Sequence, residues 1–342
     1  MNNSNIRLCT PKDWKQILPL VEVWPFKPMA PLNGFRRSSL VDFTCVRVLK
    51  ALSNENCGAC IATEENDARG FACFNMLPWD SEQLGVPAAR IDYLVAEGSY
   101  DEQRRIKEAL LEWVLAEVET SGVRHLSIRI DASDYSSLHE LEAAGFNTID
   151  TILTFAIDLS KLQLLEPKHD FKIRLANESD AERVSALART AFVYDRFHAD
   201  PSISRERADE LHATWLRDSC NGKAVDAVLL AEDESGLLGF ASCLVQHDTR
   251  KLGRMVGTII LAASAERARG RGVAHATMMA ATEWLCQQGC EIVEGGTQVR
   301  NIPSARLFRR CGFVMVGASV SLRKLCSTKV LFLPKGTSEK LK

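Results

Sequence analysis

The sequence lacks several features that would assign it to whole classes of protein. Its formal net charge is only -2 at pH 7, so it has no general excess of positive charge for binding nucleic acid or an anionic membrane. No apolar run approaches the ~20 residues that a membrane-spanning helix needs. The first residues also lack the basic and apolar segments of a secretion signal. We therefore expect a cytoplasmic protein that binds neither nucleic acid nor membranes.

The cysteines show no pattern typical of disulfides or of a metal site. Eleven cysteines are spread over 342 residues, which indicates reduced thiols in a chain without a secretion signal. Cys57 and Cys60 form a single CxxC pair, with no second pair and no histidine nearby. We interpret them as buried small apolar residues, and we expect no metal.

What the sequence does contain is an internal repeat, in a chain long enough for two domains. Four short patterns occur twice, in the same order and at spacings of 167 to 171 residues. The pairs are Ile6-Arg7-Leu8 with Ile173-Arg174-Leu175, Gly70-Phe71-Ala72 with Gly239-Phe240-Ala241, Glu112-Trp113 with Glu283-Trp284, and Gly145-Phe146 with Gly312-Phe313. We infer two copies of one domain, residues 1–165 and 170–330, joined by a linker that contains Pro167.

The second copy predicts strands and helices that alternate only in part. We expect a helix that begins after a cap at Ser179 or Asp180. An irregular stretch should follow, and residues 257–264 should form a buried strand because they are continuously apolar. Other strands are expected at 172–176, 227–232, 237–246, 291–298 and after Gly312, and other helices at 273–288 and 304–311. The fold class is therefore α/β (mixed α+β), with a mixed central sheet flanked by helices in each copy.

A turn rich in glycine and arginine follows the apolar strand. Arg269-Gly270-Arg271-Gly272-Val273-Ala274 stands between that strand and the next expected helix. Glycine lets the backbone approach an anion closely, and the first N–H groups of a helix lack partners within it. Neighbouring arginines add charge-assisted bonds to phosphate oxygens. The segment predicts a pyrophosphate site, although a solvated basic turn is an alternative. The order Gly-Lys-Ser/Thr of a P-loop is absent.

Two motifs in the expected order make the chain resemble the GNAT acyltransferases. Residues 269–274 are similar to the family's Q/R-x-x-G-x-G/A acyl-CoA motif. Asn301, Ala305, Phe308 and Gly312-Phe313 are similar to its second motif, N-x-x-x-A-x-x-Y-x-x-x-G-F. The resemblance implies two tandem GNAT-like domains and acetyl-CoA as the co-substrate. It also implies the co-substrate-binding residues Leu261, Ala262, Ala263, Arg269, Gly270, Arg271, Gly272, Val273, Ala274, Asn301 and Phe308.

The resemblance further implies how these residues act. Residues 261–263 would pair with the pantetheine arm as an added strand does, and the amides of residues 270–274 would hold the pyrophosphate. Asn301 would contact the co-substrate, although capping the next helix is a compatible alternative.

The first copy has no such turn. Its corresponding segment, residues 91–102, contains no Gly-x-Gly, and its acidic residues would repel a pyrophosphate: Glu97, Asp101 and Glu102. We predict that this half binds no acyl-CoA and instead helps to shape an acceptor pocket between the domains.

Two segments indicate the acceptor by resemblance to the nucleotide-sugar acetyltransferases that finish fucosamine. Residues 79–86 resemble a W-D/E-x-x-F-F-G-V segment, and residues 191–201 resemble an S/Y-x-R-F loop of those enzymes. The resemblance implies a small-molecule amine as partner, a dTDP-4-amino-4,6-dideoxyhexose, and by analogy a homodimer. A peptide or another small amine as acceptor, and a non-catalytic acyl-CoA sensor, remain as alternatives.

The implied reaction is direct transfer, in which the neutral amine attacks the thioester. The family's acidic tyrosine is replaced by Phe308, and the arginine before it by Leu307. We expect Tyr194 and His198 to be the catalytic residues, because they lie in the acceptor loop and can donate or accept protons. A thiol of pKa ~8.5 is a fair leaving group near neutral pH, so the loss of the tyrosine slows the reaction without forbidding it.

Overall fold

The structure is a computed structural model that describes residues 5–32, 34–161 and 169–326, so the predicted linker residue Pro167 lies outside the described residues. The first half contains β1 (Asn5–Leu8), α1 (Trp14–Val23), α2 (Arg37–Leu52), β2 (Cys57–Glu64), β3 (Asp67–Met76), α3 (Pro78–Leu84), β4 (Ala88–Ala96), α4 (Tyr100–Thr120), β5 (His125–Asp131), α5 (Tyr135–Ala143) and β6 (Asn147–Asp158). The second half contains β7 (Lys172–Leu175), α6 (Ala181–Ala191), α7 (Arg196–Ala199), α8 (Arg205–Cys220), β8 (Ala227–Asp233), β9 (Gly236–Gln246), β10 (Val256–Ser264), α9 (Val273–Gln287), β11 (Ile292–Gln298), α10 (Ile302–Arg310) and β12 (Val314–Leu325).

The predicted repeat is present in three dimensions. Both Ile-Arg-Leu patterns are edge strands, and each arginine pairs with the aspartate that follows it, Arg7 with Asp13 at 2.8 Å and Arg174 with Asp180 at 2.7 Å. Gly239 lies under α9, where an added Cβ would come within 2.9 Å of Val273. Gly70, the counterpart of Gly239 in the first half, lies under α4 in the same way. The repeated residues thus hold equivalent strands and helices together.

In the described residues, twelve strands form one mixed sheet in the order β1-β2-β3-β4-β5-β12-β6-β11-β10-β9-β8-β7. The pairs β4–β5 and β10–β11 are parallel, and the other neighbours are antiparallel. The prediction of a mixed sheet flanked by helices is confirmed.

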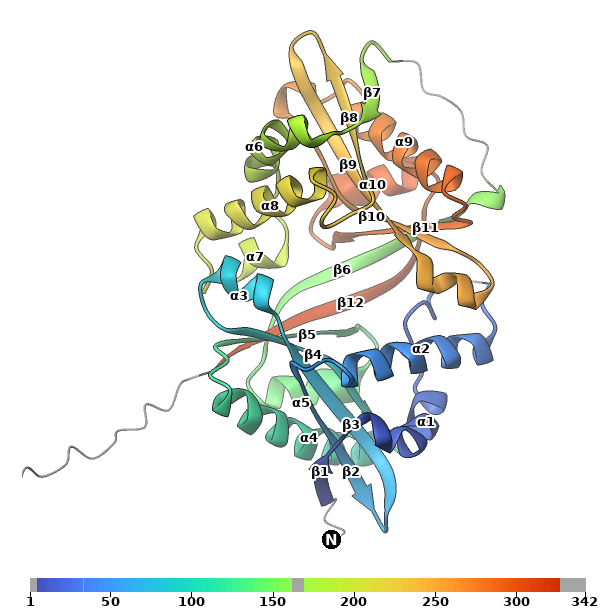
Figure 1. The fold of residues 1–342 in the computed structure, drawn as a ribbon, viewed down its shortest axis with the longest axis vertical. Helices are drawn as coiled ribbons and strands as arrows, with labels where there is room; N and C mark the ends of the chain where they lie inside the picture. The colour runs from blue at the N-terminus through green and yellow to red at the C-terminus, as the bar shows by residue number, and fades with distance from the viewer. Residues whose placement is uncertain (1–4, 33, 162–168, 327–342) are drawn as a thin grey trace, which may run out of the picture.

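Each half gives its last strand to the other half of the sheet. β6 lies between β12 and β11, and β12 lies between β5 and β6 (Figure 1). The halves therefore share main-chain hydrogen bonds along both strands, which the sequence did not predict. The domain limits at residues 165 and 170 stay a prediction about where one repeat ends and the next begins.

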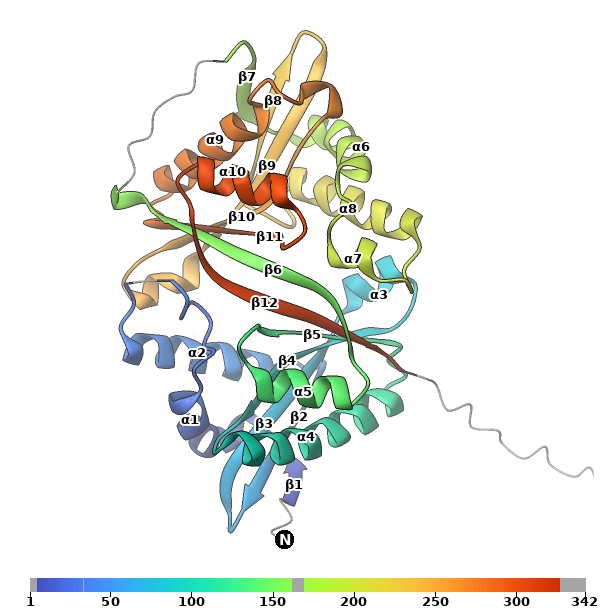
Figure 2. The same cartoon turned by 180° about the vertical axis from the view of Figure 1, so that it is seen from behind.

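Helices cover both faces of the sheet. α1, α2, α6 and α8 lie on the face seen in Figure 1, and α4, α5, α9 and α10 lie on the face seen in Figure 2. On α4 the buried residues Ile106, Leu110, Val114 and Val118 recur at helical spacing, so one apolar stripe faces the sheet. The two repeats thus present corresponding helices on each face.

The structure departs from the expected elements in the second half in two places. The stretch expected to be irregular after residue 191 contains α7 and the long helix α8. The side chain that caps the turn before α6 is that of Asn177, which accepts a hydrogen bond from the N–H of Ser179, whereas Asp180 makes no such cap to α6. Among the described residues, no helix is long and apolar enough to cross a membrane.

The CxxC pair lies on β2. Residues three apart on a strand point to opposite faces of the sheet. Cys57 accordingly packs with the α1–α2 side, and Cys60 packs with the α4 side. This placement agrees with the interpretation of the two cysteines as separate small apolar residues.

Candidate active site

β10 and β11 pair only at their beginnings. Residues 256–259 align in parallel with residues 292–295, and the two strands then separate. Past Ile259, β10 also bulges against β9 before pairing resumes at Ala262. The side of β10 that faces β11 is therefore open to an added strand, as predicted. Leu261 is an exception, because its N–H donates to the Ser242 Oγ of β9 at 3.0 Å.

A cavity of about 570 Å³ lies at this opening, against α9 and α10. The structure brings several of the predicted residues together in its lining, namely Ala262, Ala263, Gly270, Ala274 and Asn301. Asn301 also caps α10, since its Oδ1 accepts a hydrogen bond from the N–H of Ser304 at 3.3 Å. Both roles foreseen for this residue are therefore available to it. The lining also contains residues that the sequence analysis missed: Ser264, Thr277, Met278, Pro303, Ser304, Arg306, Leu307 and Arg310.

The N-terminus of α9 faces this cavity without a side-chain cap. Gly270 and Gly272 have φ values of 81° and 79°, in the left-handed region that favours glycine. A Cβ at either position would meet no atom within 4 Å. Within the described part of the chain, the N–H groups of Gly272, Val273 and Ala274 have no acceptor. Unpaired N–H groups at a helix N-terminus favour an anion.

The arginines near this turn differ in availability. Arg271 pairs with Asp233 at 2.8 Å and with Asp170 at 3.2 Å, so its side chain is engaged by carboxylates. Arg269 is exposed and pairs with Glu266. Arg306 and Arg310 line the cavity, and neither has a carboxylate within 4.0 Å among the described residues. Their spacing of four residues on a predicted helix was the signal that could have identified them.

Phe308 does not reach the cavity. Its side chain is buried in the core, stacked on Phe155 with ring centroids 4.9 Å apart and edge-on to Phe313. Its ring packs over Gly295 of β11, where an added Cβ would lie 2.9 Å away. Phe308 therefore supports the sheet where β10 and β11 separate, and the sequence-based role in co-substrate contact has no support in this packing.

The two predicted catalytic residues also lie outside the cavities. Tyr194 is partly exposed and contacts Arg300, whose guanidinium lies 5.8 Å from the centre of its ring. His198 Nδ1 bonds to Asp195 at 2.6 Å, and its Nε2 bonds to Asp209 at 2.9 Å. The hydrogen bond with Asp195 raises the pKa of His198, and neither ring nitrogen remains for a substrate.

His212 lies beside His198, and potential ligand atoms of His212, His198 and Asp195 lie within 4.8 Å of one another. Such a cluster could hold a metal ion. We interpret it as an ion-pair network around His198 instead, because both nitrogens of His198 are already hydrogen-bonded to carboxylates.

The corresponding place in the first half has a smaller cavity, of about 350 Å³, and its charged groups are already paired. Lys107 of α4 is buried, and its Nζ donates to Asp134 at 3.1 Å and to two serines at the start of α5. Asp134 caps α5 as Asn301 caps α10. At the N-terminus of α4, Ser99 and Glu102 form a capping box that satisfies the N–H groups there. These contacts favour the prediction that this half has no anion site, which stays a prediction.

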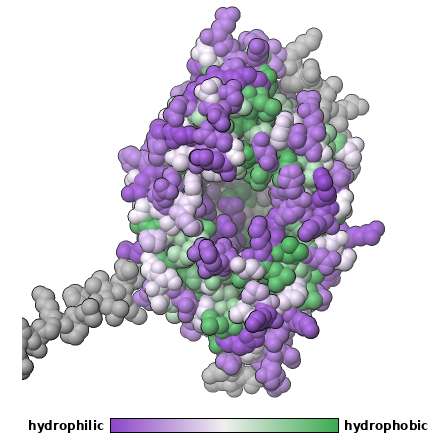
Figure 3. Space-filling model, viewed as in Figure 1, coloured by the Kyte–Doolittle hydropathy of each residue, from purple (hydrophilic) through white to green (hydrophobic). Residues whose placement is uncertain are grey.

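A larger cavity of about 1310 Å³ lies between the halves on the opposite face of the sheet. Figure 3 shows it as a hollow bordered mainly by hydrophilic residues. From the second half it includes Glu294, which accepts hydrogen bonds from Gln246 at 2.7 Å and from Thr258 at 3.3 Å. Burial raises the pKa of Glu294. This residue could not be predicted from the sequence, because a lone glutamate in a strand matches no motif.

Glu294 lies next to the opening between β10 and β11. It precedes Gly295, the last residue of β11 that pairs with β10. Neighbouring residues of a strand point to opposite faces, so Gly295 faces α10 while Glu294 faces the central cavity. The two cavities therefore lie on opposite faces of the sheet where these strands separate.

The two segments expected to bind the acceptor come together, one from each half. Arg196 of α7 lies 3.8 Å from Asp80 of α3. Phe197 packs in the same apolar cluster as Trp79 and Leu84. These contacts lie where α3 and α7 stand next to each other in Figure 1, although their residues are not part of the lining of the central cavity.

Comparison with known proteins agrees with this arrangement. Residues 190–313 match the model of the acetyltransferase (GNAT) family. The spore coat polysaccharide biosynthesis protein SpsD of Bacillus subtilis (strain 168) is 24% identical over 251 residues, which are 73% of this chain and 82% of that protein. A GCN5-related N-acetyltransferase from Sphaerobacter thermophilus superposes with a TM-score of 0.62 at 19% identity, covering 94% of this chain and 95% of that one.

A tandem GNAT protein from the clavulanic acid biosynthesis pathway superposes with a TM-score of 0.58 at 14% identity, over 95% of this chain and 99% of that one. Structural likeness at such identities establishes the fold, and the family match covers residues 190–313, which contain the uncapped helix and the open strand. The chain therefore has the fold of the tandem GNAT proteins, and this part of its second half is similar to the GNAT acetyltransferase family.

Proposed function

We propose that this protein transfers an acetyl group from acetyl-CoA directly to the amino group of a nucleotide-linked amino sugar. One observation carries the proposal: two cavities lie on opposite faces of the sheet where β10 and β11 separate. A co-substrate on one face and an acceptor on the other can react through such an opening. Binding both reactants in line supplies much of the rate acceleration.

The residues around the smaller cavity fit acetyl-CoA, which supplies the activated acetyl thioester. The N–H groups at the start of α9 would hold the pyrophosphate, and Arg306 and Arg310 would add positive charge. Ser264 Oγ is buried beside this cavity and has no hydrogen-bond partner among the described residues. A buried hydroxyl without a partner is costly, and a polar group of the co-substrate would satisfy it.

Glu294 is the residue we assign as general base. The acceptor amine must lose a proton, and Glu294 lies in the central cavity beside the strand opening. Its raised pKa brings it closer to neutral pH, where a carboxylate is a better base. Main-chain N–H groups of β10 beyond Ile259 would stabilise the oxyanion. No acid is needed at position 308, because the thiolate can leave unaided.

The size and lining of the central cavity support the acceptor class. At about 1310 Å³ it exceeds the roughly 300–1,000 Å³ of most small-molecule pockets, so it can accept a nucleotide sugar. It contains aromatic and basic side chains together, including Trp24, Tyr93 and Arg129. The relative from Bacillus subtilis is named for polysaccharide biosynthesis, which is consistent with a sugar acceptor.

The test is turnover of acetyl-CoA with dTDP- and UDP-linked amino sugars, measured as thiol release. We expect Glu294→Gln to lower kcat by about 100-fold or more, the usual scale of general-base catalysis, while the Kd for acetyl-CoA stays unchanged. The wild-type rate should rise with pH as Glu294 loses its proton, and this limb should vanish in the variant.

Asp248→Asn is the matched control, because Asp248 lines the same cavity but is paired with Arg47. It should keep kcat within about threefold of wild type, since a group outside proton transfer does not contribute the 10²–10⁴-fold of a general base. Binding of acetyl-CoA without turnover of any amine would contradict the proposal and favour a sensor. An unchanged kcat in Glu294→Gln would refute the assignment of the base.

A further inference from the structure

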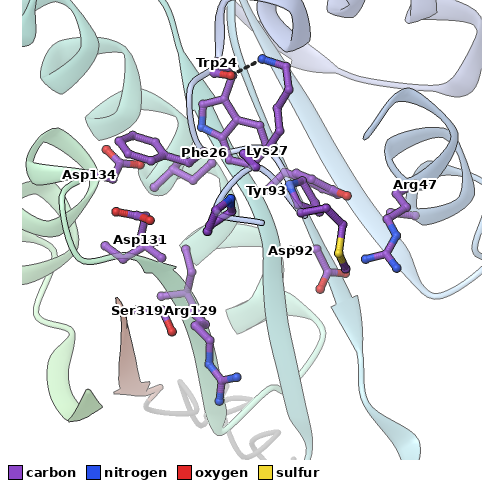
Figure 4. Close-up of a pocket in the computed structure, with 18 of the residues that line it drawn as sticks. Trp24, Phe26, Lys27, Arg47, Asp92, Tyr93, Arg129, Asp131, Asp134 and Ser319 are labelled. Atoms are coloured by element: carbon purple, nitrogen blue, oxygen red, sulfur yellow. Dashed lines mark hydrogen bonds between the residues drawn. The ribbon is translucent and has the colours of Figure 1, made fainter. Parts of the chain in front are cut away.

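The first half contains a strand opening like that of the second half, but with a different lining. β4 and β5 pair in parallel over residues 88–91 and 125–128 and then separate. The central cavity extends into this opening, with Tyr93 on one side and Arg129 on the other. The segment after α1 enters the same opening, so that Trp24 and Phe26 line both this cavity and a smaller one of about 350 Å³ beside Lys107. Figure 4 shows these aromatic residues at one end and Arg129 at the other.

We propose that this half, in which Lys107 and its partners take the place of an anion site, binds the nucleoside diphosphate part of the acceptor. Arg90 and Arg129 contact the phosphates, and Trp24, Phe26 and Tyr93 surround the base. The inference rests on the proposed function, and it assigns to the first half the recognition of the substrate.

Arg129 is an arginine of this opening that lacks a carboxylate partner. Its Nε donates to Ser321 Oγ at 3.2 Å, and no carboxylate lies within 4.0 Å of it among the residues that the structure describes. Desolvation by the protein atoms around it, followed by repulsion from Arg196, lowers the pKa of Arg129, although the residue remains exposed. Three arginines from β4, β5 and α7 thus converge here, since Arg90 also acts on Arg129. A diphosphate would relieve this repulsion and accept charge-assisted hydrogen bonds.

Several carboxylates line the cavity but do not pair with Arg129. Asp92 pairs with Arg90 at 2.6 Å, and Asp248 pairs with Arg47 at 3.0 Å. Asp131 accepts hydrogen bonds from the Ser133 hydroxyl and N–H. Each of these three acids already has a hydrogen-bond or ion-pair partner of its own, whereas, in the described part of the chain, Arg129 is hydrogen-bonded only to the hydroxyl of Ser321.

Two buried polar atoms beside the aromatic residues lack partners. Asn75 is 5% exposed and lines the cavity; its Nδ2 donates to Asp92 at 2.7 Å, but its Oδ1 accepts no hydrogen bond from any described residue. Trp24 Nε1 is also buried and donates to no described residue. A pyrimidine base carries both N–H donors and carbonyl acceptors, so it offers partners for both atoms. The Trp24 and Tyr93 rings, 6.0 Å apart, add apolar contact.

The register of the shared strands orders the groups along the cavity. Glu294 lies opposite Ala156 on β6, while Arg129 shares a row with Ser321 and with Asp150, six residues further along β6. This separation is roughly 20 Å along the strand, before the side chains turn inward. The diphosphate at Arg129 and the amine at Glu294 would thus lie at different positions along the same face of the sheet.

The test is binding of free dTDP and UDP to the intact chain while CoA is present at a saturating concentration. CoA itself contains an adenosine diphosphate, so this condition blocks its site. We expect one nucleoside diphosphate to bind per chain, and Arg129→Gln to weaken it by about tenfold to 100-fold, the effect of losing a charge-assisted hydrogen bond. Arg90→Gln, also at an exposed position, should weaken it too and serves if the first variant does not fold.

Arg306→Gln is the control, since it lies in the other cavity. It should weaken CoA and leave the nucleoside diphosphate unaffected. Displacement of dTDP and UDP by CoA, or wild-type affinity in both Arg90→Gln and Arg129→Gln, would overturn the inference. If acetyl-CoA is turned over with an amine but no nucleoside diphosphate binds beside CoA, this inference alone fails. If acetyl-CoA neither binds nor reacts, the proposed function fails, whatever the nucleotides do.

Discussion

Replacing Gly272 with aspartate tests the anion site at the start of α9 most directly. A carboxylate at this position would stand beside the N–H groups proposed to bind the pyrophosphate. At roughly 5 Å and an effective dielectric constant of about 20, repulsion between one pair of charges is about 3 kcal/mol. That energy corresponds to a rise of about 100-fold in the Kd for acetyl-CoA.

The folded protein should tolerate the change. Gly272 has a φ of 79°, where a side chain costs about 1–2 kcal/mol, although aspartate adopts this conformation more readily than most residues. The new Cβ would meet no atom within 4 Å. Aspartate is also favoured at the N-cap and by the helix dipole, which contribute about 0.5–1 kcal/mol in the opposite sense. The net change in the free energy of unfolding should therefore be close to zero.

Titration calorimetry with acetyl-CoA measures the predicted loss, and thermal unfolding without ligand measures stability. Gly222→Asp is the matched control, because Gly222 has a φ of 71° and equally open space but ends α8, away from the cavity. The control should keep the wild-type Kd. A Kd within about threefold of wild type in Gly272→Asp would mean that the start of α9 does not bind the phosphates.

Two further predictions concern stability. Lys107→Met should lower the free energy of unfolding by about 3–5 kcal/mol in urea titrations, because it leaves the buried Asp134 without its cation. The Kd for acetyl-CoA should stay unchanged, and a loss of stability no larger than the ~1 kcal/mol of an exposed ion pair would refute the prediction. Asp200 joins the halves by pairing with Arg323 at 2.6 Å and with His125 at 3.3 Å. Burial alone would raise the pKa of Asp200, but these partners hold it well below its usual value. The contribution of Asp200 to stability is therefore fully present above about pH 4, its pKa in the unfolded chain, and is lost as the pH falls further. Asp200→Asn should destabilise the protein at pH 7 and should make its stability fall less steeply in acid. Equal acid sensitivity of the variant and the wild type would refute this.

Most of the fold could be predicted because its signals are local. The apolar run of β10 and the glycines after it indicated strand, turn and helix, and the repeated Ile-Arg-Leu patterns indicated two equivalent copies. The helix α8 was not predicted, because its apolar residues are few and its first half is rich in charged residues. The exchange of β6 and β12 has no local signal, since a strand pairs as well with one neighbour as with the other.

Only part of the candidate site could be predicted, because only part of it depends on local sequence signals. Motif spacing located Gly270, Gly272 and Asn301, because an anion site on a helix N-terminus is built from consecutive residues. Tyr194 and His198 were chosen for their chemistry in a loop, but carboxylates that only tertiary packing brings near His198 occupy its nitrogens. The roles proposed for Glu294 and Arg129 depend on a cavity between the halves, which only the tertiary structure reveals.

By itself the sequence determined the repeat, the mixed sheet and the turn rich in glycine and arginine, because each depends on residues close together in the chain. The tertiary structure alone decided which charges are engaged, such as Arg271, and which face a cavity without a carboxylate partner, such as Arg129. The reason is that burial and ion pairing depend on neighbours from distant segments, and in this protein those neighbours come from both halves of one shared sheet.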